Sequence, residues 1–126
     1  MAEFKLKMQE AKEHDIQGEI IAYLRRDSRV AWVERFNTGA HVVIDSHTKR
    51  RRFIRYGFKG LSDLLGQLSD GRLFAVECKS RTGKPTEEQQ VFLEKVRGAR
   101  GVAILARSVS DVKQGLAEAQ QGGVKW

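Results

Sequence analysis

Two carboxylates and a lysine lie close together in a segment that the sequence predicts to be a β-hairpin. The residues are Asp63, Glu77 and Lys79, and two apolar runs between them flank a Ser-Asp-Gly turn at 69–71. A three-residue hairpin loop favours glycine at its last, left-handed position. Counting the register from this loop places Asp63 opposite Glu77, with Lys79 two residues further along on the same sheet face.

Two facing carboxylates in an apolar hairpin need a compensating charge. Directly opposed residues have Cβ atoms only about 4.5–5.5 Å apart, where like charges are destabilising. A divalent cation such as Mg²⁺ or Mn²⁺ would remove the repulsion, because hard cations prefer oxygen ligands. We therefore take Asp63 and Glu77 as candidate metal ligands, with the backbone carbonyl of Cys78 as a further oxygen. Lys79 would orient the attacking water or stabilise the developing phosphate charge, so the segment indicates a metal-dependent hydrolase.

Other chemistries fit this segment less well. A structural salt-bridged hairpin is the main alternative, because Asp followed by Glu-x-Lys is a common pattern. Zinc is disfavoured, because His14, His41 and His47 lack the spacing of zinc ligands. Cys78 is a weak candidate nucleophile without a recognisable histidine partner, and no glycine-rich phosphate loop precedes a helix.

Two predicted helices carry polar side chains on faces that should be buried. Residues 10–26 form the first helix, where Glu13 and Gln17 share a face with apolar side chains. Residues 86–97 form the second helix, where Gln89 does the same. We expect all three to converge on the carboxylate pocket, because a buried charge or amide is costly without a partner. A capping box with Thr86 is the alternative for Gln89, and an exposed first turn is the alternative for the other two.

The remaining elements give an α/β order. Extended segments are predicted at 30–36, 41–44, 52–56, 63–68, 72–79 and 102–106, the last of them buried on both faces. A last helix is predicted at 111–121 with Ser110 as its N-cap, and Gly98 suits the end of the second helix. The order is αβββ with extra strands, then αβα.

Length and composition indicate one soluble globular domain over residues 1–126. The chain is 40% hydrophobic and 31% charged, which is ordinary for such domains. It has no apolar run near the ~20 residues of a membrane span and no apolar signal-peptide segment. The single cysteine fits a reducing compartment, so we expect a cytoplasmic protein that does not bind membranes.

The net charge of +7 is concentrated in one basic segment. Six cationic residues fall within eleven positions, interleaved with aromatic residues: Lys49, Arg50, Arg51, Arg52, Arg55 and Lys59. Such a cluster attracts polyanions and contributes salt-dependent binding to nucleic acid. The alternative is a solvated basic loop. Beside a metal site, the cluster favours nucleic acid as the substrate.

Four short motifs occur in a fixed order across residues 10–108. They are Glu13-x-x-Ile16-Gln17, Gly60-x-x-Asp63, Val76-Glu77-x-Lys79 and Thr86-x-x-Gln89. This ordered set resembles the PD-(D/E)XK nuclease superfamily, and within it the stand-alone VRR-NUC group of phages and bacteria. The chain departs from the superfamily pattern at Ser62, which replaces proline before the aspartate, and at Cys78, whose type is unusual there.

The resemblance implies an α/β protein with the restriction-endonuclease-like αβββαβ core, followed here by the C-terminal helix. It implies that Asp63, Glu77 and the Cys78 carbonyl bind Mg²⁺ or Mn²⁺. It assigns catalytic positions to five side chains: Asp63, Glu77, Lys79, Gln89 and Glu13. It further implies a homodimer that cuts Holliday junctions or other branched DNA in the cytoplasm of a bacterial or phage-infected cell.

Three other functions stay open at this point. The protein would be a nuclease for flaps, nicks or linear duplex, a catalytically inactive DNA-binding module, or a basic RNA-binding protein. Metal-dependent cleavage distinguishes a nuclease from the inactive module, and competition between junction DNA and RNA tests the RNA-binding alternative. Phe4, Leu6 and Trp126 are apolar candidates for a dimer contact.

Overall fold

The computed structural model describes residues 2–36, 40–55 and 57–122. The helices are α1 (Ala2–Leu24), α2 (Glu87–Gly98) and α3 (Val109–Gln121), and the strands are β1 (Val30–Arg35), β2 (Ala40–Ile44), β3 (Arg51–Arg55), β4 (Leu64–Leu68), β5 (Leu73–Cys78) and β6 (Val102–Ala106). The first helix begins at Ala2, not near residue 10 as predicted. Residues 2–12 contain many good helix formers but no apolar stripe, so propensity carries the helix beyond its periodic part.

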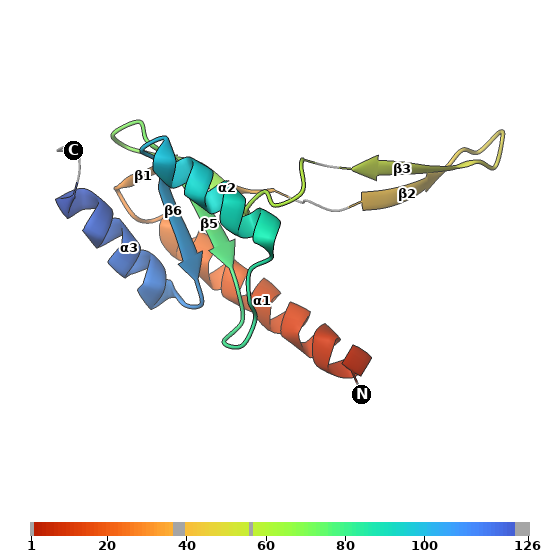
Figure 1. Cartoon of the computed structure of the whole chain (residues 1–126), viewed down its shortest axis with the longest axis horizontal. Helices are drawn as coiled ribbons and strands as arrows, with labels where there is room; N and C mark the ends of the chain where they lie inside the picture. The colour runs from red at the N-terminus through yellow and green to blue at the C-terminus, as the bar shows by residue number, and fades with distance from the viewer. Residues whose placement is uncertain (1, 37–39, 56, 123–126) are drawn as a thin grey trace.

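The strands form a main sheet and a separate ribbon. Within the described residues, the main sheet has the order β1-β4-β5-β6, and β2 and β3 pair only with each other. The β5–β6 pair is parallel, whereas β1–β4 and β4–β5 are antiparallel. The β2–β3 ribbon projects from the body (Figure 1). Without this ribbon, the element order is αβββαβα, which agrees with the predicted mixed α/β architecture.

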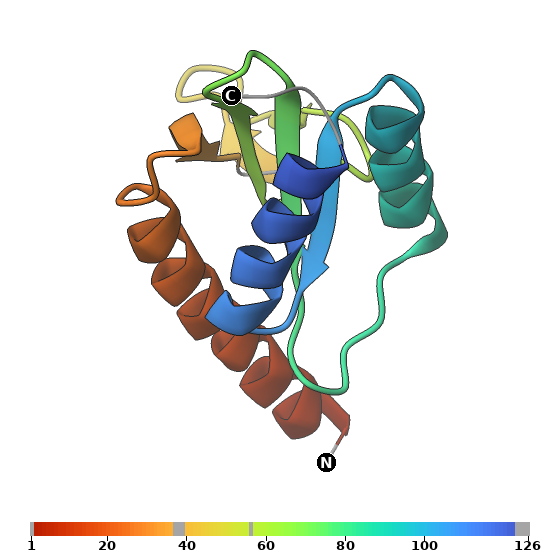
Figure 2. The same cartoon turned by 90° about the vertical axis from the view of Figure 1, so that its left-hand side faces the viewer.

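Helices cover both faces of the main sheet (Figure 2). The larger core joins α1 and α3 to one face, with side chains such as Leu24, Phe74 and Leu116 fully buried. The smaller core joins α2 to the other face through Leu93 and Val96. Alternation along β5 therefore directs Glu77 toward the α2 side and the Cys78 side chain into the larger core.

The β4–β5 hairpin has the register predicted from its loop. Leu65 pairs with Ala75, and the Leu68 N–H donates to the Arg72 carbonyl at 2.9 Å. Gly71 has a φ of +96°, the left-handed conformation that the loop requires at this position. The hairpin that positions the two carboxylates was therefore predicted correctly.

The predicted N-cap of α2 is confirmed, and that of α3 is wrong. Thr86 Oγ1 accepts from the Gln89 N–H at 3.2 Å, and Gln89 Oε1 accepts from the Thr86 N–H at 2.8 Å, which completes a capping box. For α3, Ser108 and not Ser110 is the cap, because its Oγ accepts from the Asp111 N–H at 3.2 Å. Ser108 lies three residues before Asp111, so its hydroxyl can accept from the free N–H at the third position of the helix. Ser110 already lies within the helix.

The end of α2 also differs from the prediction. Gly98 is the last helical residue, and the left-handed position after the helix is Arg100, with a φ of +69°. Arg97, in the last turn, reaches the outer edge of the sheet. Its Nε and Nη2 donate to the Ala103 carbonyl at 3.1 and 2.9 Å. Because Ala103 lies on the edge strand β6, this guanidinium covers part of that edge.

Candidate metal centre and nucleic-acid interface

Asp63 is fixed at the end of the sheet where β4 begins. Its Oδ2 accepts from the Cys78 N–H at 2.8 Å, and its backbone carbonyl accepts from the Phe36 N–H at 3.0 Å. The β4–β5 pairing reaches Leu64 opposite Val76, so the next step of the ladder places Asp63 beside Glu77. The predicted approach of the two carboxylates is confirmed.

The carboxyl group of Glu77 is buried, and among the described residues only one of its two oxygens has a hydrogen-bond partner. The residue is 1% exposed, and its Oε1 accepts from Gln89 Nε2 at 2.9 Å. Its Oε2 is buried and has no hydrogen-bond partner among the described residues. Burial first, and the neighbouring Asp63 carboxylate second, raise the pKa of Glu77 to about 9. Without a cation, the site therefore favours the protonated form of Glu77 at neutral pH over two ionised carboxylates.

Lys79 lies directly after β5 on the same side as Glu77. Its side chain is largely buried, with the residue 9% exposed, and its Nζ is 3.8 Å from Glu77 Oε1. Its backbone N–H donates to the Ala106 carbonyl on β6 at 3.0 Å. The backbone of Lys79 is therefore held by the neighbouring strand, and its ammonium group faces the carboxylate pair at longer range than a direct hydrogen bond.

Gln89 has both of the functions that were predicted as alternatives. Its amide oxygen completes the capping box of α2 with Thr86, and its amide nitrogen donates to Glu77. One half of the side chain is thereby fixed by the helix terminus, so the other half is held in one orientation. Gln89 connects the start of α2 to the carboxylate pair.

Of the two polar residues predicted on the inward face of α1, Glu13 contacts the segment that follows Lys79. Glu13 and Gln17 are both half-buried, as predicted for an inward face. The contact that Glu13 makes is with the backbone: its Oε1 accepts from the Ser80 N–H at 3.5 Å. Glu13 therefore supports the segment after Lys79, and the contacts on Glu77 come from Gln89 and Lys79.

The oxygen atoms present fit a cation that retains water. In the part of the chain that the structure describes, no group of three or more His, Cys, Asp or Glu side chains is placed to hold a metal ion. Mg²⁺ is commonly bound by one or two carboxylates, with water and substrate phosphate completing its shell. Asp63 and the unpaired Oε2 of Glu77 meet that requirement. The Cys78 carbonyl faces the Asp63 side, because the N–H and C=O of one strand residue point the same way.

The Cys78 thiol is excluded from the chemistry by its surroundings. It is buried in the core on the opposite sheet face, and burial raises the pKa of the thiol far above its ordinary value. A nucleophilic cysteine needs a lowered pKa and access to substrate. The alternative of Cys78 as a nucleophile is therefore rejected.

Arg107 was not identified from the sequence, although it shapes the site. Its Nη1 donates to the carbonyls of Ser80 and Gly83, each at 2.5 Å. These bonds hold the turn that connects Lys79 to α2. An arginine between a strand and a helix has no sequence signature for this contact, because its partners are backbone atoms more than twenty residues away.

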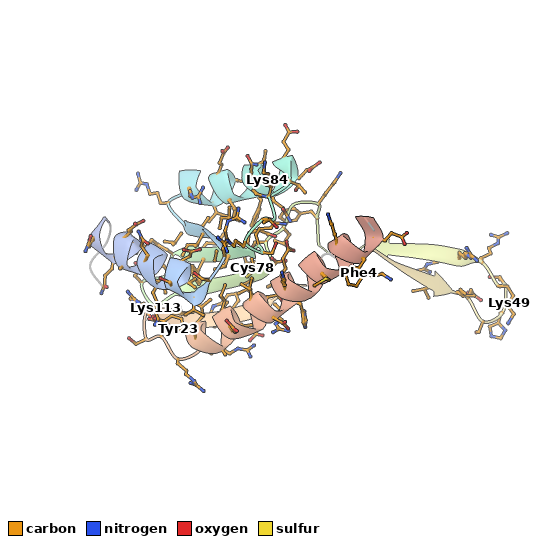
Figure 3. All side chains as sticks on the ribbon, turned by 90° about the horizontal axis from the view of Figure 1, so that it is seen from below. Phe4, Tyr23, Lys49, Cys78, Lys84 and Lys113 are labelled. Carbon is orange, nitrogen blue, oxygen red and sulfur yellow. The ribbon has the colours of Figure 1, made fainter. Side chains whose placement is uncertain are left out.

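The basic segment is divided between the projecting ribbon and the body. Lys49, Arg50, Arg51 and Arg52 are exposed on the ribbon, with Lys49 at its far end (Figure 3). Lys59 lies on the body, where its Nζ is 3.2 Å from Glu88 Oε1. The side chain of Arg55 is outside the described part of the structure, as are those of Leu6 and Trp126, whereas Phe4 is exposed.

Across residues 2–36, 40–55 and 57–122, no helix is both long and apolar enough to cross a membrane.

Comparisons with known proteins leave the structure as the basis for assigning a function. The chain matches none of the protein-family models against which it was scanned, and no curated protein matches it.

Proposed function

We propose that this protein is a Mg²⁺- or Mn²⁺-dependent DNA endonuclease that hydrolyses phosphodiester bonds. The observation that supports the proposal most strongly is the half-buried Asp63 beside the buried Glu77, whose Oε2 has no hydrogen-bond partner among the described residues. An isolated buried acceptor is costly in a folded protein, and a bound cation would satisfy it. The αβββαβ order of the elements also supports the resemblance to PD-(D/E)XK nucleases of the VRR-NUC group.

The residues that would hold the cation are Asp63, Glu77 and the Cys78 carbonyl. A cation bound there would polarise the scissile phosphoryl group and lower the pKa of a coordinated water. Asp63 is oriented for this by the Cys78 N–H. Glu77 is oriented by Gln89, which occupies Oε1 and leaves Oε2 available.

Lys79 would supply the positive charge that the chain itself brings to the reaction. Its ammonium group lies beside Glu77 and is largely shielded from solvent, so its field is weakly screened. In this position it would orient the attacking water or stabilise the charge that develops on the phosphate. Glu13 and Arg107 would act as positioning residues, because both hold the backbone that follows Lys79.

The substrate we propose is branched DNA, with a four-way junction favoured. The exposed cations Lys49 to Arg52 support a polyanionic partner, and the resemblance supports a homodimer that makes paired cuts. Cleavage of flaps, nicks or linear duplex is the alternative activity. A catalytically inactive DNA-binding module is the alternative without chemistry.

The proposal is tested by incubating a labelled synthetic four-way junction and a linear duplex with the protein and Mg²⁺, Mn²⁺ or EDTA. We expect paired, metal-dependent cuts in the junction. Lys79→Ala should abolish cleavage and retain DNA binding, whereas Lys95→Ala, a matched loss of charge on exposed α2 surface, should cut normally. Cleavage by Lys79→Ala at the wild-type rate would refute the mechanism. Tight junction binding without cleavage in any metal would favour the inactive module.

A further inference from the structure

The β2–β3 ribbon, residues 40–55, is an arm that projects from the body (Figure 1). Val43 pairs with Arg52, and Ile44 pairs with Arg51. Because successive strand residues face opposite sides, one face presents Val43 with Arg52 and the other Ile44 with Arg51. The two aliphatic residues are 42% and 60% exposed, and both arginines are exposed. Each face therefore combines a solvent-exposed aliphatic side chain with an exposed arginine.

This surface is unusual for a ribbon that remains in water. A two-stranded ribbon is at best marginally stable in water, because it has no core of its own. Exposed aliphatic side chains beside a row of cations indicate a surface that a partner covers, and the charge requires that partner to be anionic. The arm contains five cationic residues and one carboxylate, Asp45.

The carboxylate fixes the end of the arm. Asp45 Oδ1 accepts from the His47 and Thr48 N–H groups at 2.8 and 2.9 Å. The backbone closes the turn through Asp45 N–H to the Arg50 carbonyl and Lys49 N–H to the Asp45 carbonyl, both at 2.9 Å. Lys49 takes a φ of +58° to complete it. The cations at the tip are thus carried on a defined turn.

Both ends of the arm enter the body beside the carboxylate pair. Before the arm, the Phe36 N–H donates to the Asp63 carbonyl at 3.0 Å. After the arm, the Phe58 ring packs on Phe92 of α2, with centroids 5.3 Å apart. Gly60 follows with a φ of +95°, so close to α2 that an added Cβ would lie 2.4 Å from the Glu88 carbonyl oxygen. A substrate held at Asp63 therefore lies at the base of the arm.

We propose that the arm inserts as a β-ribbon into the major groove of duplex DNA next to the cleaved phosphate, an inference that rests on the proposed nuclease function. The major groove of B-DNA is about 12 Å wide and admits a two-stranded ribbon. There the arginines can donate to guanine edges, the aliphatic side chains can contact thymine methyl groups, and the tip cations can contact phosphates. The deep, narrow major groove of duplex RNA excludes such a ribbon.

The binding test uses the full chain in EDTA, so that cleavage does not interfere. Fluorescence anisotropy measures binding to a labelled duplex DNA and to duplex RNA of the same sequence. The arm variant is Arg51→Ser/Arg52→Ser. Its matched control is Lys95→Ser/Lys113→Ser, which removes the same charge from α2 and α3, and Lys113 lies at the end of the molecule away from Lys49 (Figure 3). We expect the arm variant to bind duplex DNA at least about tenfold more weakly than the control variant.

A second readout separates groove insertion from simple charge attraction. We expect the protein to protect guanine N7 atoms, which lie in the major groove, from dimethyl sulfate. Val43→Ser/Ile44→Ser keeps the charge of the arm and should lose that protection, while its thermal unfolding shows that the body remains folded. Unprotected guanines, equal binding by the arm and control variants, or equal binding of duplex RNA would each overturn the proposal.

The two proposals fail in different ways. If no metal supports cleavage but DNA binding in EDTA still requires the arm and protects guanine N7, the nuclease function is wrong, and only the insertion of the arm into the major groove stands. If metal-dependent cleavage occurs and the arm variant binds and cuts like its control, the arm proposal is wrong and the nuclease function stands.

Discussion

Replacing Glu77 with glutamine should stabilise the metal-free protein and abolish the proposed nuclease activity. The new side chain would keep the shape of the old one, accept from Gln89 through its amide oxygen and donate to Asp63 through its amide nitrogen. The native carboxyl instead carries an unpaired buried oxygen next to another carboxylate. The substitution removes the repulsion and with it a ligand for the cation.

The magnitude follows from the raised pKa. Glu77 has an ordinary pKa of 4.5 and a folded-state pKa of about 9. The folded protein therefore binds a proton more tightly than the unfolded chain, and stability is lost as pH rises between those two values. The slope is at most about 1.4 kcal/mol per pH unit, so between about pH 5 and pH 7 the wild type should lose about 2–3 kcal/mol.

The assay is urea unfolding of wild type and Glu77→Gln in EDTA across this pH range. We expect the stability difference in favour of Glu77→Gln to grow with pH. Excess Mg²⁺ should then reduce the pH dependence of the wild type and leave the variant unchanged, because the cation stabilises the ionised carboxyl. A constant difference between the two proteins at all pH values, or equal stabilisation of both by Mg²⁺, would refute the reasoning.

Substitutions at three further residues test the support of the site and the end of α1. Gly60→Ala should destabilise the protein by about 2 kcal/mol or more in urea unfolding. The residue has a φ of +95°, and its added Cβ would lie 2.4 Å from the Glu88 carbonyl oxygen. Unchanged stability would show that α2 can move away from residue 60. Thr86→Ala should cost about 1 kcal/mol and Thr86→Ser much less, because only the alanine removes the cap oxygen. Asp27→Asn should lower the free energy of unfolding by about 2 kcal/mol at neutral pH. Hydrogen bonds from Arg29 stabilise the ionised carboxylate and hold the pKa of Asp27 well below its ordinary range. That stability is present above the ordinary pKa and is lost as pH falls, so wild type and Asp27→Asn should converge in acid, and a constant difference would contradict the assignment.

The hairpin that carries the candidate site could be predicted because its restraints are local. Gly71 determines the loop, the loop determines the register, and the register brings Asp63 to Glu77. The inward orientation of Gln89 was also predictable from helical periodicity. That Gln89 serves both as a cap and as a partner of Glu77 could not be predicted. The sequence does not show that the amide oxygen is used by the capping box while the amide nitrogen contacts Glu77.

Features that depend on distant contacts could not be predicted. Arg107 holds the backbone after Lys79 through carbonyl groups, which every residue has, so side-chain types give no signal. The extended segments at 41–44 and 52–56 were predicted as strands, but nothing in their sequence indicated that they would leave the main sheet. The length of α1 was missed because its first half relies on helix propensity without an apolar stripe.

The guanidinium of Arg97 has a consequence for how copies of this protein can meet. An edge strand with free carbonyl groups is a template for another strand, and β6 is such an edge. Because Arg97 already donates twice to the Ala103 carbonyl, a neighbouring strand would have to displace a charged side chain before it could pair there. Sheet growth across β6 is thereby disfavoured. Two copies of this chain are therefore not expected to join their sheets by pairing one β6 strand with another.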